Sequence, residues 1–240
     1  MSRRTHTPAQ VAAAWSVHVF TAMGALAGLL AIIAISDNDW MWAFFWMIIT
    51  VIVDGVDGTL ARCFKVKEVL PHFDGSLLDN IVDYLTFTMI PAFFIYEAGL
   101  IPLQTGFLGS IAIILASSYQ FCQADAKTDD NYFKGFPSYW NVVVLYLFLL
   151  DLDPMWNLLI LLVLAVLAFV PLKYIYPTRS AILRRVTITF SLIWALTLAV
   201  ALLRYSADAH MPWVYASFTF VAYYVGLSLW VNRPSAGSTA

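Results

Sequence analysis

Four aspartates lie within or beside long apolar stretches of the sequence. Asp54 and Asp57 are three residues apart near the end of one stretch, and Asp79 and Asp83 are four apart at the start of the next. These spacings place each pair on one face of a helix. A carboxylate at membrane depth is costly unless it faces a cavity, a partner or an ion, and Arg62 is the basic residue nearest to Asp54 and Asp57. Carboxylate oxygens suit Mg²⁺ and Mn²⁺, so the pattern predicts a divalent-metal site.

The four carboxylates are expected to converge. The two stretches are consecutive and join on one side of the membrane, which favours antiparallel neighbouring helices. Four carboxylates offer enough oxygens to bridge two ions about 4 Å apart, an arrangement that clamps phosphoryl groups. Gly55, Gly58, Ala61 and Gly75 leave room for a large polar substrate to approach the backbone. One aspartate alone could be a helix cap or a partner of Arg62, but four at this spacing favour two bound Mg²⁺ or Mn²⁺ ions.

The composition places these acids in a membrane protein. Of 240 residues, 61% are hydrophobic and 12% are charged, and the mean hydropathy is +0.78, whereas a soluble domain is about a quarter charged. The excess apolar surface must face lipid, which predicts an all-α integral membrane helical bundle. At roughly 25 to 30 residues per span and connection, residues 1–240 form a single membrane domain of about eight transmembrane helices. The net charge of −2 excludes a strongly basic nucleic-acid binder, so no nucleic-acid partner is expected.

Eight apolar segments are predicted to cross the membrane. They are residues 10–35, 40–61, 77–98, 102–123, 139–150, 155–176, 186–205 and 211–231. The fifth is short and could instead be a shallow or broken helix. All of the 13 Lys and Arg residues except Arg204 fall on one side, which the positive-inside rule assigns to the cytoplasm. Both termini, the four aspartates and the free thiols of Cys63 and Cys122 are then expected on the cytoplasmic side.

The acidic motif resembles the signature of the CDP-alcohol phosphotransferases. It reads Asp54-x2-Asp57-Gly58-x2-Ala61-Arg62-x12-Gly75-x3-Asp79-x3-Asp83, with a longer stretch before Gly75 than is usual in the family. The resemblance implies CDP-diacylglycerol as the phosphatidyl donor and CMP as the leaving group. It implies that Asp54, Asp57 and Asp79 are metal ligands and that Asp83 is a ligand, the general base, or both. The residues implied to line the nucleotide and diphosphate site are Gly58, Ala61, Arg62 and Gly75.

Further features resemble a bacterial branch of this family that synthesises phosphatidylcholine. They are the long loop 63–74, the eight spans and the segments 119–130 and 135–141. This resemblance implies choline as the acceptor, membrane lipid as a partner, and a bacterial inner membrane with the active site facing the cytoplasm. A quaternary ammonium binds on aromatic faces, at roughly 0.5–2 kcal/mol per contact. The candidate choline-binding residues are Tyr119, Asp125, Tyr139 and Trp140. An interfacial belt of aromatic residues would explain the three rings equally well.

Three other functions fit parts of the pattern. The same chemistry could use serine, inositol or glycerol 3-phosphate as the acceptor. Intramembrane prenyltransferases also use aspartate-rich Mg²⁺ sites, but their two acidic motifs lie on well-separated helices. A divalent-cation transporter would favour acids at mid-membrane and an inverted repeat. The family resemblance also suggests a homodimer, and His18, in the first predicted span, is expected to be a core or interface histidine.

Overall fold

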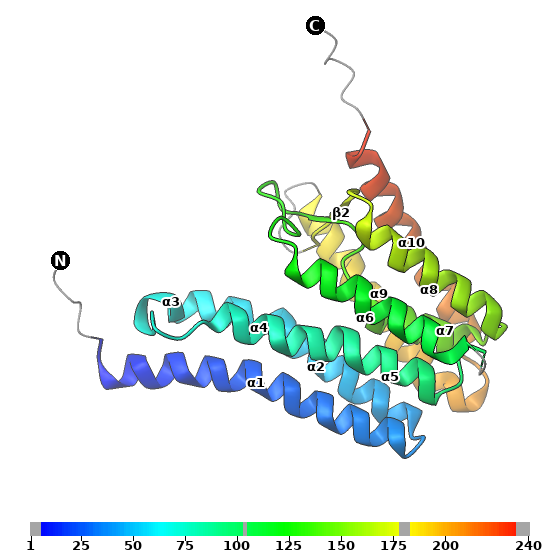
Figure 1. Ribbon diagram of the computed structural model, residues 1–240, viewed down its shortest axis with the longest axis horizontal. Coiled ribbons are helices and arrows are strands. Elements are labelled where there is room, and N and C mark those ends of the chain that lie inside the picture. Colours follow the sequence, from blue (N-terminus) through cyan, green and yellow to red (C-terminus); the bar gives the residue numbers. More distant parts are fainter. Residues whose placement is uncertain (1–5, 103–104, 178–182, 234–240) are drawn as a thin grey trace, which may run out of the picture. The chain divides into compact units, whose positions relative to one another are not determined.

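The computed structural model describes residues 6–102, 105–177 and 183–233. Contacts between residues divide the chain into two compact units, Met1–Ala98 and Gly99–Ala240. Helices make up most of each unit (Figure 1). The prediction of a single domain over residues 1–240 stays a prediction.

Three helical runs form the first unit, and α1 packs against the other two. α1 (Pro8–Ser36) starts at a capping box, in which the Thr7 side chain accepts a hydrogen bond from the Gln10 N–H while the Thr7 N–H donates to the Gln10 side chain. α2 (Trp40–Cys63) follows after a tight turn, and the short α3 (Val66–Val69) lies in the loop beyond it. The capping box explains why α1 begins before the first strongly apolar residues.

The third run carries the second half of the acidic motif. It consists of α4 (Gly75–Tyr84), a π-helical turn η1 (Leu85–Met89) and α5 (Ile90–Glu97). The π turn ends two residues before Pro91, which has no N–H to close an ordinary helical hydrogen bond. In Figure 1 this run lies lengthwise beside α1 and antiparallel to α2. The hairpin expected from the sequence is therefore present.

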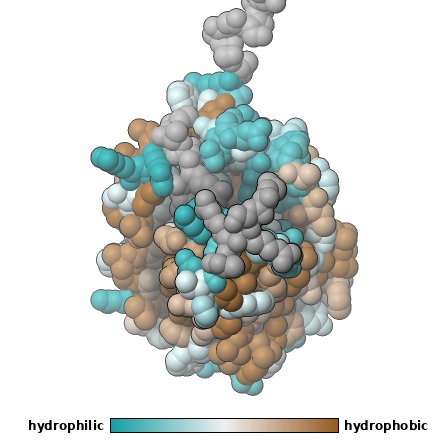
Figure 2. Space-filling view, turned by 90° about the vertical axis from the view of Figure 1, so that its left-hand side faces the viewer, coloured by the Kyte–Doolittle hydropathy of each residue, from teal (hydrophilic) through white to brown (hydrophobic). Residues whose placement is uncertain are grey.

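Small residues form the buried face of α1. The buried small residues are Ala14, Val17, Thr21, Gly24, Ala27, Gly28, Ala31 and Ala34. Small side chains let helix backbones approach closely in a lipid environment. On other faces of α1, large apolar residues such as Val19, Met23 and Leu26 are exposed. Hydrophobic residues also cover much of the molecular face in Figure 2, as expected of a surface that contacts lipid.

The second unit combines helices with a two-stranded sheet. Its described helices are α6 (Gly106–Cys122), α7 (Trp140–Leu150), α8 (Pro154–Phe169), α9 (Arg184–Arg204), the 3-10 turn η3 (Tyr205–Ala207) and α10 (Met211–Val231). The strands β1 (Tyr132–Lys134) and β2 (Lys173–Ile175) pair antiparallel, with Phe133 opposite Tyr174. α6 packs against α8, and α10 packs against both α9 and β2. The strand pair is an addition to the expected all-α bundle.

The sixth predicted segment, residues 155–176, is wrong at its end. α8 ends at Phe169, and β2 occupies the last part of the predicted span. Pro171 cannot continue a helix. The N–H of Lys173 donates to Asn232 Oδ1 at 2.9 Å, and the N–H of Ile175 donates to Ser228 Oγ at 3.3 Å. Side chains at the end of α10 and at its C-cap therefore satisfy backbone groups that a helix would have paired internally.

The helices agree with the predicted helical membrane protein at the level of fold class. The described runs that are long and apolar enough to cross a membrane are the five at Pro8–Ser36, Trp40–Cys63, Gly75–Glu97, Arg184–Ala207 and Met211–Val231. Shorter apolar helices are Phe107–Cys122, Trp140–Leu150 and Pro154–Phe169. Each of the eight predicted segments thus contains a helix, while the count of eight spans and the cytoplasmic termini stay predictions.

Candidate functional site

Three of the four predicted carboxylates come together. Asp54, Asp57 and Asp79 each offer a carboxylate oxygen, and these oxygens lie within 4.8 Å of one another. Asp57 is 5% exposed, and the other two are half-buried. Three carboxylates this close repel one another, and a divalent cation between them offsets that repulsion. The cluster could therefore hold a metal ion of the hard, oxygen-binding class.

The antiparallel hairpin explains how the cluster forms. Asp54 and Asp57 lie in the last three turns of α2, and Asp79 lies in the second turn of α4. The three-residue spacing in α2 puts both side chains on one face of that helix. Because α4 returns along α2, its early turns lie beside the late turns of α2 (Figure 1). The sequence spacing and the connection together suffice to predict this meeting.

Asp74 fixes the start of α4, although it is outside the sequence motif. Its Oδ1 accepts hydrogen bonds from the Ser76 N–H at 3.1 Å and the Leu77 N–H at 3.0 Å. The Ser76 hydroxyl donates to the same oxygen at 2.7 Å. These bonds, the Ser76 hydroxyl first, lower the pKa of the Asp74 carboxyl. The carboxylate thus stays charged at a helix N-terminus, where negative charge is favourable.

Asp83 lies one turn after Asp79 and is half-buried at the end of α4. Among the described residues, the group of three close carboxylates does not include Asp83. Directly beyond it, the Thr86 hydroxyl donates to the Asp83 carbonyl at 3.5 Å inside the π turn. π turns in helices occur frequently at functional sites. The absence of Asp83 from the group of three favours a role for it that differs from that of Asp54, Asp57 and Asp79.

The small residues of α2 have different surroundings. A Cβ at Gly58 would lie 3.5 Å from Arg62 Nη1, so the guanidinium lies over this turn. Arg62 Nη2 also donates to Thr59 Oγ1 at 2.9 Å. Ala61 instead packs against a buried apolar cluster formed by α1 and α3. Gly58 and Arg62 therefore share one surface of α2, whereas Ala61 faces the protein interior.

Gly75 makes room for a protein side chain, which the sequence did not predict. A Cβ at this position would lie 2.5 Å from Cε1 of His18. His18 is 6% exposed, which confirms the prediction of a core histidine. The two residues are far apart in sequence, and no periodic pattern connects them.

Comparison with known proteins decides the family. The model of the family described as CDP-alcohol phosphatidyltransferase matches residues 16–172, which contain both acidic pairs. This chain belongs to the CDP-alcohol phosphatidyltransferase family. The resemblance inferred from the motif is thus confirmed, and the chain is a membrane-embedded transferase.

Three relatives match most of the chain. The chain is 43% identical over 229 residues to the phosphatidylcholine synthase of Pseudomonas aeruginosa, covering 93% of this chain and 94% of that protein. It is 41% identical over 228 residues to the phosphatidylcholine synthase of Legionella pneumophila, covering 92% and 89%. With the phosphatidylcholine synthase of Borreliella burgdorferi the identity is 42% over 189 residues, covering 79% and 81%.

Two of the predicted choline-binding residues belong to α6 and α7. Tyr119 is 44% exposed, and its ring centroid lies 4.7 Å from that of Phe169. Trp140 is fully buried, and its indole N–H donates to Ser117 Oγ at 2.7 Å. The structure therefore leaves the Tyr119 ring accessible and gives Trp140 a partner within the protein.

The other two candidates lie near β1. Asp125 is exposed and forms an ion pair with Lys134 at 2.6 Å. The hydrogen bond from Lys134 lowers the pKa of the Asp125 carboxyl. The ring of Tyr139 lies 6.1 Å from that of Phe133 and 6.4 Å from that of Tyr224, measured between centroids. The four candidates thus have different partners, and their choline-binding role stays a prediction.

Proposed function

We propose that this member of the CDP-alcohol phosphatidyltransferase family transfers the phosphatidyl group of CDP-diacylglycerol to choline, giving phosphatidylcholine and CMP. The observation that carries the proposal is the meeting of Asp54, Asp57 and Asp79 in a chain that matches phosphatidylcholine synthases over most of its length. The first supports phosphoryl chemistry, and the second supports choline as the acceptor.

The proposed metal ligands are Asp54, Asp57 and Asp79, holding two Mg²⁺ or Mn²⁺ ions. Such ions, when bound, offset the charge of the diphosphate and the charge that develops on the departing CMP. Asp83 is proposed as the general base. It takes the proton of the choline hydroxyl while that oxygen bonds to the phosphorus bearing diacylglycerol and the bond from this phosphorus to the CMP oxygen breaks. General-base catalysis of this kind contributes about 10²–10⁴-fold.

The nucleotide and diphosphate are proposed to lie over the late turns of α2 and the start of α4. The proposed lining residues are Gly58, Ala61, Arg62 and Gly75, of which Gly58 and Arg62 share one surface of α2, whereas Ala61 also packs against the apolar cluster and Gly75 against His18. Support comes from the Arg62 guanidinium, which lies over Gly58 and can donate to a phosphate with two parallel N–H groups. The absence of a side chain at Gly58 lets the diphosphate approach the backbone.

The proposed choline-binding residues are Tyr119, Asp125, Tyr139 and Trp140. Of these, Tyr139 is the best supported. Its ring lies near the rings of Phe133 and Tyr224, and grouped aromatic faces favour a quaternary ammonium. Tyr119 adds an exposed ring. To contact choline, Asp125 would have to break its ion pair with Lys134, and Trp140 would have to become exposed.

The membrane arrangement is also part of the proposal. It has eight spans in a single domain, both termini and the active site on the cytoplasmic side of a bacterial inner membrane, and two copies forming a homodimer. Acyl chains then stay in lipid while choline and CMP exchange with water. Cys63 and Cys122 are exposed, so a membrane-impermeant maleimide should label both in inside-out vesicles and neither in spheroplasts. Labelling in spheroplasts would contradict this topology.

An acceptor panel tests the function. Purified protein receives radiolabelled CDP-diacylglycerol and choline, serine, inositol or glycerol 3-phosphate, with Mn²⁺ and Mg²⁺ in parallel. We expect label in phosphatidylcholine, and none with the Asp57→Asn variant. Preferred turnover of another acceptor would overturn the choline assignment while leaving phosphatidyl transfer intact. Metal-ion movement across liposomes without lipid labelling would indicate a transporter instead.

A further inference from the structure

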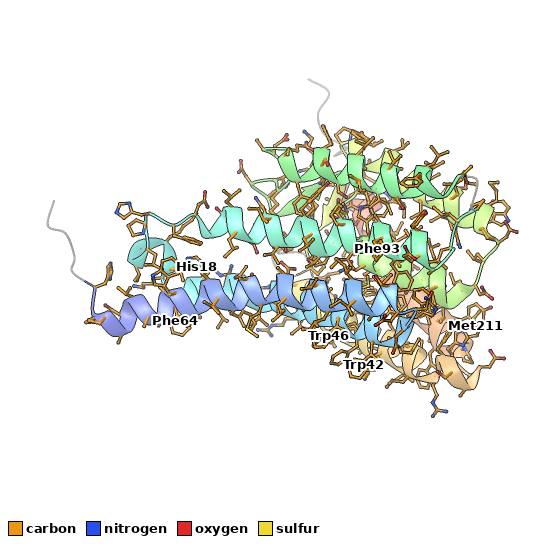
Figure 3. All side chains as sticks on the ribbon, turned by 60° about the horizontal axis from the view of Figure 1, so that its bottom comes forward. His18, Trp42, Trp46, Phe64, Phe93 and Met211 are labelled. Carbon is orange, nitrogen blue, oxygen red and sulfur yellow. The ribbon has the colours of Figure 1, made fainter. Side chains whose placement is uncertain are left out.

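The ring of His18 occupies the space that a side chain at Gly75 would need. A Cβ at Gly75 would lie 2.5 Å from His18 Cε1 and 3.2 Å from His18 Nδ1. The first distance is far below a van der Waals contact, so residue 75 must be glycine while His18 stays in place. In Figure 3, His18 projects from α1 toward the segment that leads into α4. The contact therefore joins α1 directly to the first residue of α4.

The same ring also contacts the residue before the helix cap. The centroids of His18 and Phe73 lie 4.3 Å apart, and Trp15 packs its ring edge against Phe73 at 5.1 Å. His18 thus touches the residues on both sides of Asp74, the cap of α4. These contacts hold the entry of α4 against α1 from two directions.

Packing against neighbouring residues holds this ring in place. His18 is 6% exposed, and its Nε2 has no hydrogen-bond partner among the residues that the structure describes. Burying an unpaired nitrogen costs stability, so hydrogen bonding does not account for a histidine here. The size of the ring explains why residue 18 is a histidine, because imidazole is smaller than phenyl and a phenyl ring would extend further toward Gly75.

We propose that His18 is a positioning residue for the metal site, and that Gly75 is glycine because the His18 ring fills the place of its side chain. Asp79 follows Gly75 by four residues, about one helical turn or 6 Å along the axis. A displacement at Gly75 is therefore passed to the Asp79 carboxylate. The inference rests on the proposed role of Asp79 as a metal ligand.

A double-mutant cycle tests the pair. Gly75→Ala, His18→Ala and the double variant are purified at full length, and Mn²⁺ affinity is measured from the free-ion EPR signal, without substrates. Outer-shell positioning residues typically change metal affinity by about 10–100-fold. We expect Gly75→Ala to weaken Mn²⁺ binding by at least about 10-fold, and the double variant to return close to His18→Ala alone.

Gly226→Ala is the matched control, because a Cβ at Gly226 has nothing within 4 Å and the position lies in α10. It should bind Mn²⁺ as the wild type does. If the losses of the two single variants multiply in the double variant, or if Gly75→Ala binds Mn²⁺ normally, the inference is overturned. If Gly75→Ala does not fold, recovery of folding by His18→Ala supports the inference and its absence contradicts it. A wild type that binds no Mn²⁺ refutes the metal site itself, whereas a wild type that binds Mn²⁺ but prefers another acceptor refutes only the choline assignment.

Discussion

Gly24 in α1 lies directly against Val82 in α4, such that a Cβ at residue 24 would be 2.9 Å from Val82 Cγ1. The same Cβ would be 3.4 Å from Cγ1 of Val53 in α2. Val53 precedes Asp54, and Val82 precedes Asp83. The missing side chain of Gly24 thus lets α1 support both acid-bearing helices at the depth of the acids.

Gly24→Ala should lower both stability and activity, because the added methyl group forces Val82 to shift. Overpacking of this kind typically costs about 1–3 kcal/mol. Thermal unfolding in detergent and the transfer assay measure the two effects. Val82→Ala combined with Gly24→Ala should restore stability relative to Gly24→Ala alone. If the double variant is less stable than either single variant, the contact does not limit the approach of the helices.

Asp57→Asn should change stability and activity in opposite directions. Without metal, the substitution removes one of three mutually repelling charges, so the unfolding temperature should rise. The wild type should gain about 2.7 kcal/mol when Mn²⁺ is at a hundredfold excess over its Kd, and the variant should gain much less. Transfer should fall by at least about 100-fold. Calorimetry with and without Mn²⁺, beside the transfer assay, measures these effects.

Asp208→Asn provides the control for Asp57→Asn. Asp208 is exposed and has a φ of 52°, a backbone conformation that asparagine also adopts. It should leave metal-dependent stabilisation and turnover unchanged. A metal-free Asp57→Asn protein that is less stable than the wild type would indicate that Asp57 stabilises the fold by itself.

Asp83→Asn should separate catalysis from metal binding, because Asp83 is not one of the three clustered carboxylates. We expect turnover to fall by about 10²–10⁴-fold, as for loss of a general base, with the Mn²⁺ affinity nearly unchanged. Asp79→Asn, one turn earlier, should lose both turnover and Mn²⁺ affinity. The free-ion EPR titration and single-turnover transfer measure the two properties. Loss of Mn²⁺ binding in Asp83→Asn would make Asp83 a ligand rather than only a base.

Local sequence patterns were sufficient to predict the hairpin and its acids. The spacing of Asp54 and Asp57 specifies a shared helix face, and the direct connection between consecutive helices specifies the antiparallel partner. The start of α2 at Trp40 also agrees with the prediction, because hydrophobic length and an acidic cap are both readable from nearby residues. These features depend on contacts between residues close in sequence.

Long-range contacts explain what the sequence did not show. The β1–β2 pair joins Tyr132 to Ile175, and three-residue strands have no periodicity that could distinguish them from the end of a span. The contact between His18 and Gly75 could not be predicted for the same reason. Glycine was read as space for substrate, and the residues around His18 on α1 give no sign that its ring lies against Gly75.

The last prediction concerns the cap of α4 and its dependence on pH. Hydrogen bonds from Ser76 and Leu77 lower the pKa of the Asp74 carboxyl below its usual value of 3.8. A lowered pKa in the folded state means that the stabilisation is fully present above the unfolded pKa and is lost as the pH falls through the folded value. Asp74→Ala should therefore unfold at a lower temperature than the wild type at pH 7, and the difference should shrink steadily below about pH 3.8.

Asp74→Asn separates charge from hydrogen bonding at this cap. Asparagine keeps an acceptor oxygen for the N–H groups of Ser76 and Leu77 and does not titrate. The difference in stability between Asp74→Asn and Asp74→Ala should not depend on pH. The difference between the wild type and Asp74→Ala should depend on pH. Comparing variants at each pH cancels the titration of the other acids, because those groups are shared. A gap between wild type and Asp74→Ala that stays constant from pH 7 to about pH 3 would show that the charged carboxylate does not stabilise the start of α4.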